Sequence, residues 1–359
     1  MTYNTQIVAD NVLLSYFVRY DRLTELINKE FYKSNYNEIN LYIDMYSMVK
    51  SIYKFDPSQF IDRYSLASGV INACAHYREF FWTRYKVTCK IWIVFSRMEE
   101  SIKEARTFYP GYSNVFTSEN NMAMDQIIYD NVQILDLLCK YIPDVQFIRS
   151  EFEPGLVFGR IATSQYGINV PNIIVSKDLW NLQVVGNRYL TYMLRPVKKN
   201  GEDLSILINK SNVIEYYEDI RKMKRDVLTA DPSIMNGSFI SFIMAATRFP
   251  ERGMKSLHNL SSVIKYLTTA INKLYINGDS KIYDIKGLCK DLNSVNKSNL
   301  NDYEIELRMN AIGFDACMFR YMTSAKTDNI DIINLHDPDS VKRINDKYFS
   351  KIPLNLMAL

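Results

Sequence analysis

Residues 172–184 constrain the fold of this chain more strongly than any other segment. They open with Ile173, Ile174 and Val175, an apolar β-branched run that is typical of a strand buried on both faces of a parallel sheet. The run ends at Ser176, and Asp178 follows it closely. Because open α/β sheets bind ligands beyond the carboxyl ends of their strands, this stretch predicts a carboxylate at the functional edge of a sheet.

The chain up to about residue 225 alternates between apolar runs and helical patterns. Further strands are predicted at residues 39–45, 87–95 and 145–148. Helices are predicted at residues 7–30, 65–84, 98–106, 121–141 and 156–162. Strands that alternate with helices favour right-handed crossovers and parallel pairing. The expected fold class is α/β, with a central, mostly parallel sheet flanked by helices.

The pattern changes after this region. Lys199-Asn200-Gly201 lies between strand-like runs at residues 189–197 and 204–208, and Asn-Gly in such a position is a strong hairpin signal. From about Asn212 the chain is helical almost throughout, most clearly at residues 237–247, 257–274 and 303–318. We therefore expect an α/β core over residues 1–225 and a helical C-terminal subdomain over residues 226–359.

Composition excludes several classes of protein. A net charge of +3 over 359 residues creates no global basic field, so any nucleic-acid-binding patch must be local. Three scattered histidines argue against a His-rich zinc site, and five dispersed cysteines favour reduced thiols. The sequence shows no signal-peptide pattern and no apolar run near the ~18 residues of a membrane span. We expect a cytoplasmic protein.

Polar side chains follow the predicted strands. Asp44, Ser96 and Asp178 come at strand ends, and Glu153 opens a helix after another strand. Since the carboxyl ends of parallel strands meet at one edge, these side chains are expected to lie together. Clustered carboxylates bind Mg²⁺ or Mn²⁺, and two such ions can drive phosphodiester hydrolysis.

Six segments resemble one known family in their order and spacing. They are residues 39–48, residues 91–96, Tyr109-Pro110-Gly111-Tyr112, Glu153-Pro154-Gly155-Leu156, residues 175–183 and residues 245–257. The family is that of the flap-endonuclease-like 5′-nucleases of the PIN-like superfamily, which includes phage RNase H and 5′-3′ exonucleases. The resemblance implies that Asp44, Glu153 and Asp178 are metal-binding and catalytic carboxylates. It also implies DNA or an RNA–DNA hybrid as the partner.

The chain departs from this family where the family carries further acids. Neutral residues stand at four such positions: Ser96, Gly155, Leu156 and Trp180. Arg248 and Arg252 lie in a segment in which the family normally carries further Asp residues. The family also has a basic arch after the position of Tyr112, and here that segment has lost its basic character. Hard divalent ions need several oxygen ligands. Three carboxylates would hold one ion weakly and not two, so we expect no tightly bound Mg²⁺ or Mn²⁺.

Each candidate residue also has a structural interpretation. Asp44 could be a helix cap or a solvated strand end, Asp178 a helix N-cap and Glu153 an ordinary helix start before Pro154. Trp180 reads more simply as core than as a base-stacking platform. Two interpretations apply to a set of four basic residues, namely Arg248, Arg252, Lys255 and His258. These residues could contact nucleic acid near a helix N-terminus, or they could form a solvated face.

We predict a 5′-nuclease-fold protein of phage type, in the host cytoplasm, whose metal cluster has decayed. It would serve as a nucleic-acid-binding or assembly subunit with a protein partner. The first alternative is an active metal-dependent 5′-3′ exonuclease, flap endonuclease or RNase H. The second is a purely structural interaction protein.

Overall fold

A computed structural model describes most of the predicted core. The described residues are 37–47, 65–113, 122–162, 170–185, 191–199, 202–208, 213, 216–217, 237–259, 262–263, 290, 293 and 301–312. The helix predicted at residues 7–30 and most of the one at 257–274 lie outside them.

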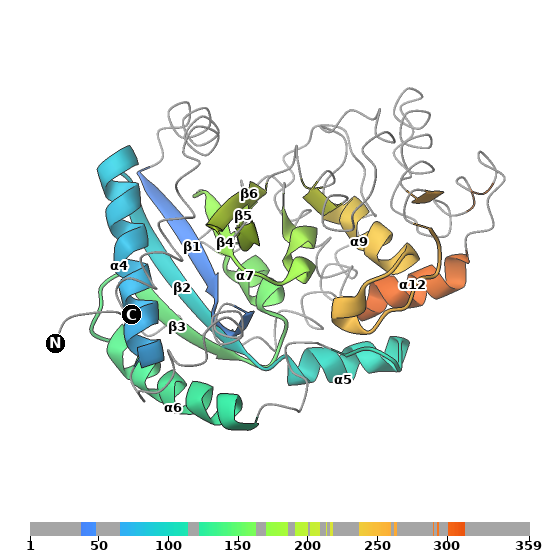
Figure 1. Ribbon diagram of the computed structural model, residues 1–359, viewed down its shortest axis with the longest axis horizontal. Helices are drawn as coiled ribbons and strands as arrows, with labels where there is room; N and C mark the ends of the chain where they lie inside the picture. Colours follow the sequence, from blue (N-terminus) through green and yellow to red (C-terminus); the bar gives the residue numbers. More distant parts are fainter. Residues whose placement is uncertain are drawn as a thin grey trace, which may run out of the picture.

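One sheet organises the described residues (Figure 1). Its strands are β1 (Glu38–Asp44), β2 (Thr88–Ser96), β3 (Val145–Ser150), β4 (Asn172–Val175), β5 (Thr191–Lys199) and β6 (Glu202–Ile208). They lie in the order β3-β2-β1-β4-β5-β6, and every pair is parallel except β5 with β6. The predicted mostly parallel α/β sheet is therefore confirmed, and the strands on either side of the Asn-Gly turn do pair as a hairpin.

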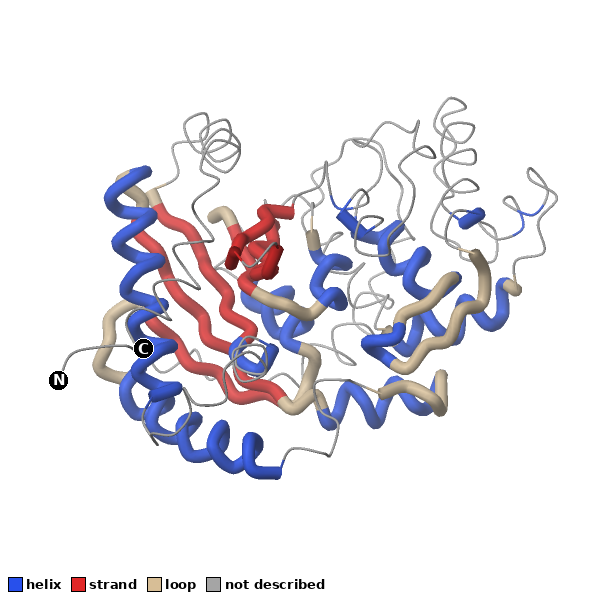
Figure 2. Tube along the Cα trace, viewed as in Figure 1, coloured by secondary structure: helices blue, strands red, loops and turns tan. Residues whose placement is uncertain are grey.

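Helices lie in the connections between strands β1 to β4 and again after the last strand (Figure 2). They are α4 (Ser65–Tyr85), α5 (Glu99–Phe108), α6 (Met122–Cys139), α7 (Pro154–Ala162), α9 (Gly237–Ala246) and α12 (Asp302–Ala311). Two short 3₁₀ helices, η2 (Leu179–Val184) and η4 (Pro250–Arg252), lie near the strand ends. None of the described helices combines the length and apolar character that a membrane-spanning helix needs.

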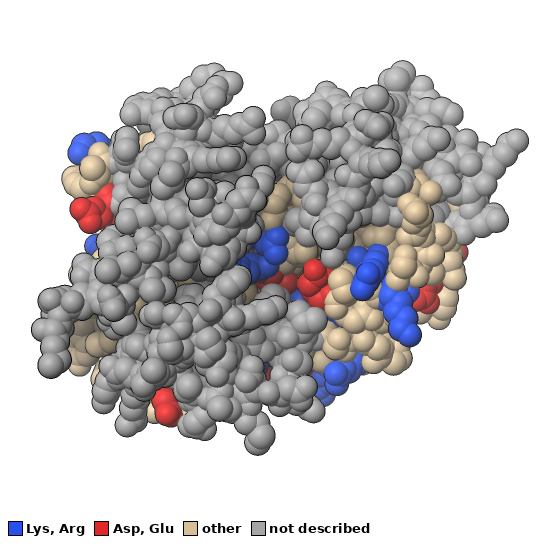
Figure 3. Space-filling model, viewed as in Figure 1, with Lys and Arg blue, Asp and Glu red and all other residues tan. Residues whose placement is uncertain are grey.

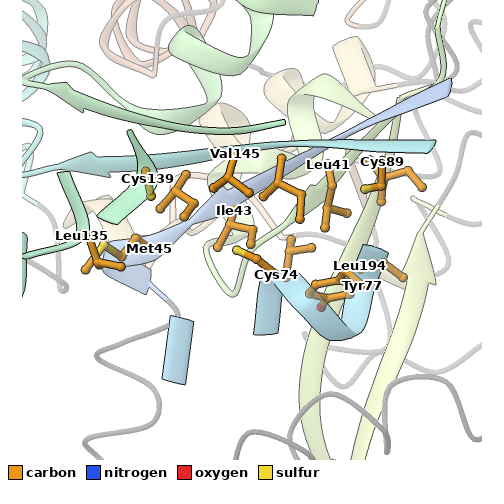
Figure 4. Close-up of a cluster of buried hydrophobic side chains, with 14 of the residues drawn as sticks. Leu41, Ile43, Met45, Cys74, Tyr77, Cys89, Leu135, Cys139, Val145 and Leu194 are labelled. Atoms are coloured by element: carbon orange, nitrogen blue, oxygen red, sulfur yellow. The ribbon is translucent and has the colours of Figure 1, made fainter. Parts of the chain in front are cut away.

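The main core fills the space between one face of the sheet and helices α4 and α6 (Figure 4). Leu41 and Ile43 of β1 point to this face, because successive strand residues alternate in direction. They pack with Cys74 and Tyr77 of α4, and Leu135 of α6 belongs to the same cluster. Each fully buried side chain of this kind contributes roughly 1.5–3 kcal/mol of transfer free energy.

The opposite face carries a buried polar network across β2, β1 and β4. The indole N–H of Trp92 donates to Asn40 Oδ1 at 3.0 Å, and Asn40 Nδ2 donates to Asn172 Oδ1 at 3.1 Å. The hydroxyl of Tyr42 donates to the same Asn172 oxygen at 2.6 Å, while its ring lies 5.3 Å from that of Phe158 in α7. Because these partners must meet, the network favours one register of the three strands.

The described C-terminal elements are helical, as predicted. Helix α9 contacts both η2 and α12, and α12 also contacts α5 (Figure 1). These contacts join the C-terminal part to the carboxyl edge of the sheet. The boundary near residue 225 stays a prediction, because it lies outside the described residues.

Candidate functional site

Asp44 and Ser176 stand side by side because of the register between β1 and β4. Ile43 pairs with Val175, so the next residue of each chain segment lies at the same level of the sheet edge. Ser176 Oγ donates to Asp44 Oδ2 at 2.7 Å, and the backbone N–H of Ser47 donates to Asp44 Oδ1 at 3.2 Å. Asp44 is fully buried, so the solvated strand-end interpretation does not apply, whereas its bond to the Ser47 N–H agrees with the helix-cap interpretation.

Ser176 connects Asp44 to the segment that follows β4. Its hydroxyl oxygen accepts from the Asp178 N–H at 3.0 Å and from Asn181 Nδ2 at 2.9 Å. A serine hydroxyl has one proton and two lone pairs. Since both lone pairs are used, its proton is left for Asp44, and the direction of this hydrogen bond is set by the neighbours.

Asp178 has two partners at once. Its Oδ1 accepts from the Trp180 N–H at 3.0 Å and so caps η2, while its Oδ2 accepts from Arg252 Nη2 at 2.5 Å. The capping interpretation of Asp178 therefore holds, and it accounts for one of the two oxygens. The helix that it caps is a 3₁₀ helix.

Glu153 precedes α7, whose first residue is Pro154. Its two oxygens accept from one guanidinium, Oε1 from Arg252 Nε at 3.1 Å and Oε2 from Arg252 Nη2 at 3.0 Å. The Tyr112 hydroxyl adds a hydrogen bond to Oε1 at 3.2 Å. Glu153 is thus both a helix start and half of a bidentate ion pair, the geometry in which Arg binds carboxylates most specifically.

Arg252 is the cation of this cluster, and it is fully buried. It ends η4 and is followed by Gly253 at φ 72°, where a Cβ would lie 2.5 Å from the Gly111 carbonyl oxygen. The Ser113 N–H donates to the Arg252 carbonyl at 3.2 Å. The prediction that Arg252 contacts nucleic acid needs correction: its side chain is spent on internal carboxylates and reaches no solvent.

Burial governs the protonation of the cluster. It raises the pKa of Asp44 to about 6; the charge of Asp178 adds to this rise, and hydrogen bonds from Ser176 and Ser47 oppose it. It also raises the pKa of Glu153, which the Arg252 guanidinium lowers in part. Burial lowers the pKa of Arg252, but Asp178 and Glu153 together hold it above its ordinary value, so the guanidinium stays charged.

No protein-family model matches this chain, and no curated protein matches it. Solved structures do. A bacteriophage T5 protein co-crystallised with metal ions aligns at a TM-score of 0.51 and 9% identity, over 87% of this chain and 98% of that one. T5 5′-exonuclease with bound zinc aligns at 0.48 and 9%, over 88% and 100%. The T5 flap endonuclease in a product complex with DNA and metal ions aligns at 0.48 and 11%, over 86% and 98%.

The chain has a flap-endonuclease-like 5′-nuclease fold. At such identity the likeness concerns the fold alone. Within this 5′-nuclease fold the three retained acids, Asp44, Glu153 and Asp178, lie at the carboxyl edge of the sheet, two of them joined through Ser176 and two through Arg252.

Three positions at which the resemblance expects acids are filled by apolar packing: Gly155, Leu156 and Trp180. The Trp180 ring lies directly on Gly155, so that a Cβ at Gly155 would be 2.2 Å from the ring. Trp180 is a core residue, in agreement with its simpler interpretation, and Leu156 is buried as well. Ser96 keeps a structural role, because its hydroxyl bonds the Phe152 carbonyl at 2.5 Å. This edge of the 5′-nuclease fold is therefore packed where the resemblance expects ligands.

The retained acids are engaged by donors of the protein itself. Both oxygens of Asp44, of Glu153 and of Asp178 already accept a hydrogen bond from a neighbouring donor. Among the described residues, no group of three or more His, Cys, Asp and Glu side chains is arranged to hold a metal. The Asn181 Oδ1 atom is buried with no hydrogen-bond donor, but one neutral oxygen does not make a site for a hard cation.

The other predicted basic residues have a different setting. Arg248 and Lys255 are exposed, and His258 is half-buried with its Nε2 accepting from the Asn301 N–H at 3.4 Å. On the face drawn in Figure 3, the described Lys and Arg side chains stand beside Asp and Glu side chains. Arg248 and Lys255 remain candidates for phosphate contact, separate from the buried Arg252.

Sequence reasoning missed the partners of the acids: Ser47, Tyr112, Ser176 and the buried Arg252. One signal in the sequence pointed toward the packing of this edge, and another pointed toward Arg252. Gly155 and Trp180 depart from the family pattern together, which indicates compensation between two touching residues. Arg252 lies in a segment where the family has acids, so a positive charge was already expected close to the retained carboxylates.

Proposed function

We propose that this protein is a 5′-nuclease-fold protein that binds nucleic acid without cleaving it. The observation that carries the proposal is the buried guanidinium of Arg252, which pairs with Glu153 and Asp178. The guanidinium is a permanent cation with five N–H donors. It therefore already offsets the negative charge of Glu153 and Asp178, which a bound metal ion would otherwise offset.

Ligand count supports the same conclusion. Two-metal hydrolysis uses carboxylates that bridge the ions and others that hold each ion separately. Gly155, Leu156 and Trp180 offer no coordinating side-chain oxygen. Stabilisation of the charge on the departing oxygen is usually the largest catalytic contribution. A site that holds no second ion lacks this contribution.

Binding to nucleic acid is supported by the exposed Arg248 and Lys255 near η4. Cations that face solvent can contact phosphates and release counterions, which makes affinity fall with salt. Arg252 takes no part in this contact. The same function would be compatible with a place in a larger assembly, in which a protein partner supplies the catalysis.

Cleavage assays test the first half of the proposal. Purified protein is incubated with flap DNA and RNA–DNA hybrids in Mg²⁺ or Mn²⁺, and we expect no product above a trace. Turnover that disappears in Asp44→Ala and Asp178→Ala would promote the active-nuclease alternative. Cleavage that persists in both variants would identify a contaminating nuclease.

A salt titration tests the second half. We expect the affinity for a DNA duplex to fall with rising salt, and Arg248→Ala plus Lys255→Ala to reduce the log–log slope by about 2. The matched control, Lys140→Ala plus Arg149→Ala, also removes one lysine and one arginine. Both residues are exposed, Lys140 directly after α6 and Arg149 in β3. Binding without salt dependence, or equal losses in both double variants, would favour the purely structural alternative.

A further inference from the structure

We infer that Glu153, Asp178, Tyr112 and Phe249 form an internal receptor for a guanidinium group, which Arg252 fills in the native protein. The inference rests on the proposed function, because it requires that no metal occupies the acids. It goes further in one respect: it assigns a ligand class to the cluster, a planar guanidinium cation, and predicts that an external one binds when the Arg252 side chain is removed.

The edge of the guanidinium is met by matched acceptors. Nε and Nη2 bind the two Glu153 oxygens at 3.1 and 3.0 Å, and Nη2 also reaches Asp178 Oδ2 at 2.5 Å. The Tyr112 hydroxyl accepts from Nε at 3.1 Å, and the Glu251 carbonyl accepts from Nη1 at 3.3 Å. All three guanidinium nitrogens therefore have an acceptor.

The guanidinium also lies over an aromatic ring. The Phe249 ring centroid lies 5.7 Å from the Arg252 Cζ atom, within the range of a cation–π contact. An aromatic face combined with carboxylates at the edge is the arrangement that suits a planar, delocalised cation. A compact ion is also attracted to the ring, but it cannot use the bidentate acceptors in the same way.

The arrangement of the acceptors suits a guanidinium better than a divalent ion. Both oxygens of Glu153 and Oδ2 of Asp178 lie along the edge of the group, each in hydrogen-bond contact with its own N–H. Mg²⁺ instead requires oxygens that converge on one point, at about 2.0–2.1 Å and in near-octahedral geometry. Glu153, Asp178 and Tyr112 are buried, and they follow β3, β4 and α5 in the chain. We therefore expect the emptied receptor to prefer guanidinium over Mg²⁺ or Mn²⁺.

The pairing also fastens the C-terminal part to the sheet. Arg252 lies in η4, directly after α9, whereas Glu153 and Asp178 follow β3 and β4. Removing the side chain leaves two buried acids without their cation, a change that is strongly destabilising in buried pairs. For Arg252→Ala we expect the melting temperature to fall by on the order of 10 °C.

Chemical rescue tests the inference. Methylguanidinium at millimolar concentration should raise the melting temperature of Arg252→Ala along a saturating curve and leave the wild-type protein unchanged. Tetramethylammonium at the same ionic strength should not rescue. Failure of methylguanidinium to rescue would overturn the inference, and so would an equal or larger rescue by Mn²⁺, which would indicate a residual metal site.

A second variant covers the case in which Arg252→Ala does not fold. Arg252→Lys keeps the charge but lacks the planar fork. The coupling between positions 252 and 153 is measured with Glu153→Gln in a double-mutant cycle of thermal unfolding. Expressed as an equilibrium constant, this coupling should be at least tenfold smaller in the Arg252→Lys background than in the protein that carries Arg252. Equal coupling for Lys and Arg would contradict a guanidinium-shaped receptor. These readouts are thermal and the proposed function is read by cleavage and binding, so either can fail alone.

Discussion

At the residue scale, Gly155 and Trp180 form a compensating pair. The backbone of α7 approaches the Trp180 ring so closely that an added Cβ would meet it at 2.2 Å and would meet Asn181 Oδ1 at 2.5 Å. The acid that the family resemblance expects at position 155 has no room while Trp180 is present. The family resemblance expects acids at positions 155 and 180, and the tryptophan at position 180 excludes an acid at position 155.

We predict that Gly155→Ala destabilises the protein by roughly 1–3 kcal/mol or more, because overpacking forces backbone and ring apart. In a Trp180→Leu background the same change should cost markedly less, although the Asn181 contact remains. Chemical denaturation of the four proteins in the cycle gives the coupling. Additive effects would show that ring and glycine do not depend on each other.

Asp44 gives a pH signature. Its pKa is about 6 in the folded protein, whereas its ordinary value is 3.8, so folding favours the protonated form. The stability that it contributes is full below about pH 4 and is lost as pH rises through 6. Relative to Asp44→Asn, the wild-type protein should lose at most about 3 kcal/mol over this range.

The measurement is urea unfolding of both proteins from pH 4 to pH 8. Glu79→Gln, an exposed position on α4, serves as the control and should show no comparable trend. A difference between wild type and Asp44→Asn that stays constant from pH 4 to pH 7 would contradict the burial of an ionisable Asp44.

At the element scale, one side chain of α12 joins three helices. Arg308 Nη1 donates to the carbonyl oxygen of Thr247 at 3.3 Å, directly after α9, and to that of Lys255 at 2.7 Å, in the segment after η4. Its guanidinium also lies 5.3 Å from the Tyr109 ring, which follows α5. Carbonyls at a helix C-terminus need such partners, and a cation is the most favourable one.

We predict that Arg308→Met lowers the free energy of unfolding by roughly 2–3 kcal/mol, since buried carbonyls lose a charged donor. Lys103→Met, whose side chain is 78% exposed on α5, is the matched control and should change stability by less than about 0.5 kcal/mol. Denaturant unfolding of the three proteins provides the comparison. Equal effects of the two substitutions would argue against the joining role of Arg308.

At the scale of the whole molecule, the sheet is most strongly enclosed at its centre. β1 and β4 lie between parallel neighbours, and their residues are buried on both faces. One face carries the apolar core under α4 and α6, and the other carries the polar network and α7. Such strands open only when the domain unfolds, whereas strands at a sheet edge can open locally.

Hydrogen exchange should reflect this arrangement. We expect the amides of Leu41 and Ile43 to exchange with the free energy of global unfolding, and those of β3 and β6 to exchange earlier. Native-state exchange at increasing denaturant separates the two classes by their dependence on denaturant. Protection in β3 and β6 equal to that in β1 would contradict an enclosed centre with weaker edges.

The sequence by itself determined the periodic parts of this protein. Strands β1, β2, β3 and β4 and helices α4, α6 and α9 were predictable because burial on a strand or helix leaves a local repeat of apolar residues. The position of Asp44, Glu153 and Asp178 at one edge followed from the same repeats, since parallel strands end together. Only residue-level packing decided which alternative each acid realised.

Tertiary structure alone decided what the acids bind. Arg252 is 99 residues from Glu153 and 74 from Asp178 in the chain, and an arginine in a loop has the same local pattern whether it meets solvent or an internal carboxylate. Its burial depends on the turn at Gly253 and on the path of the chain over the strand ends. A local repeat in the sequence cannot predict such a contact, because the energy of an ion pair depends on the positions of its partners in space.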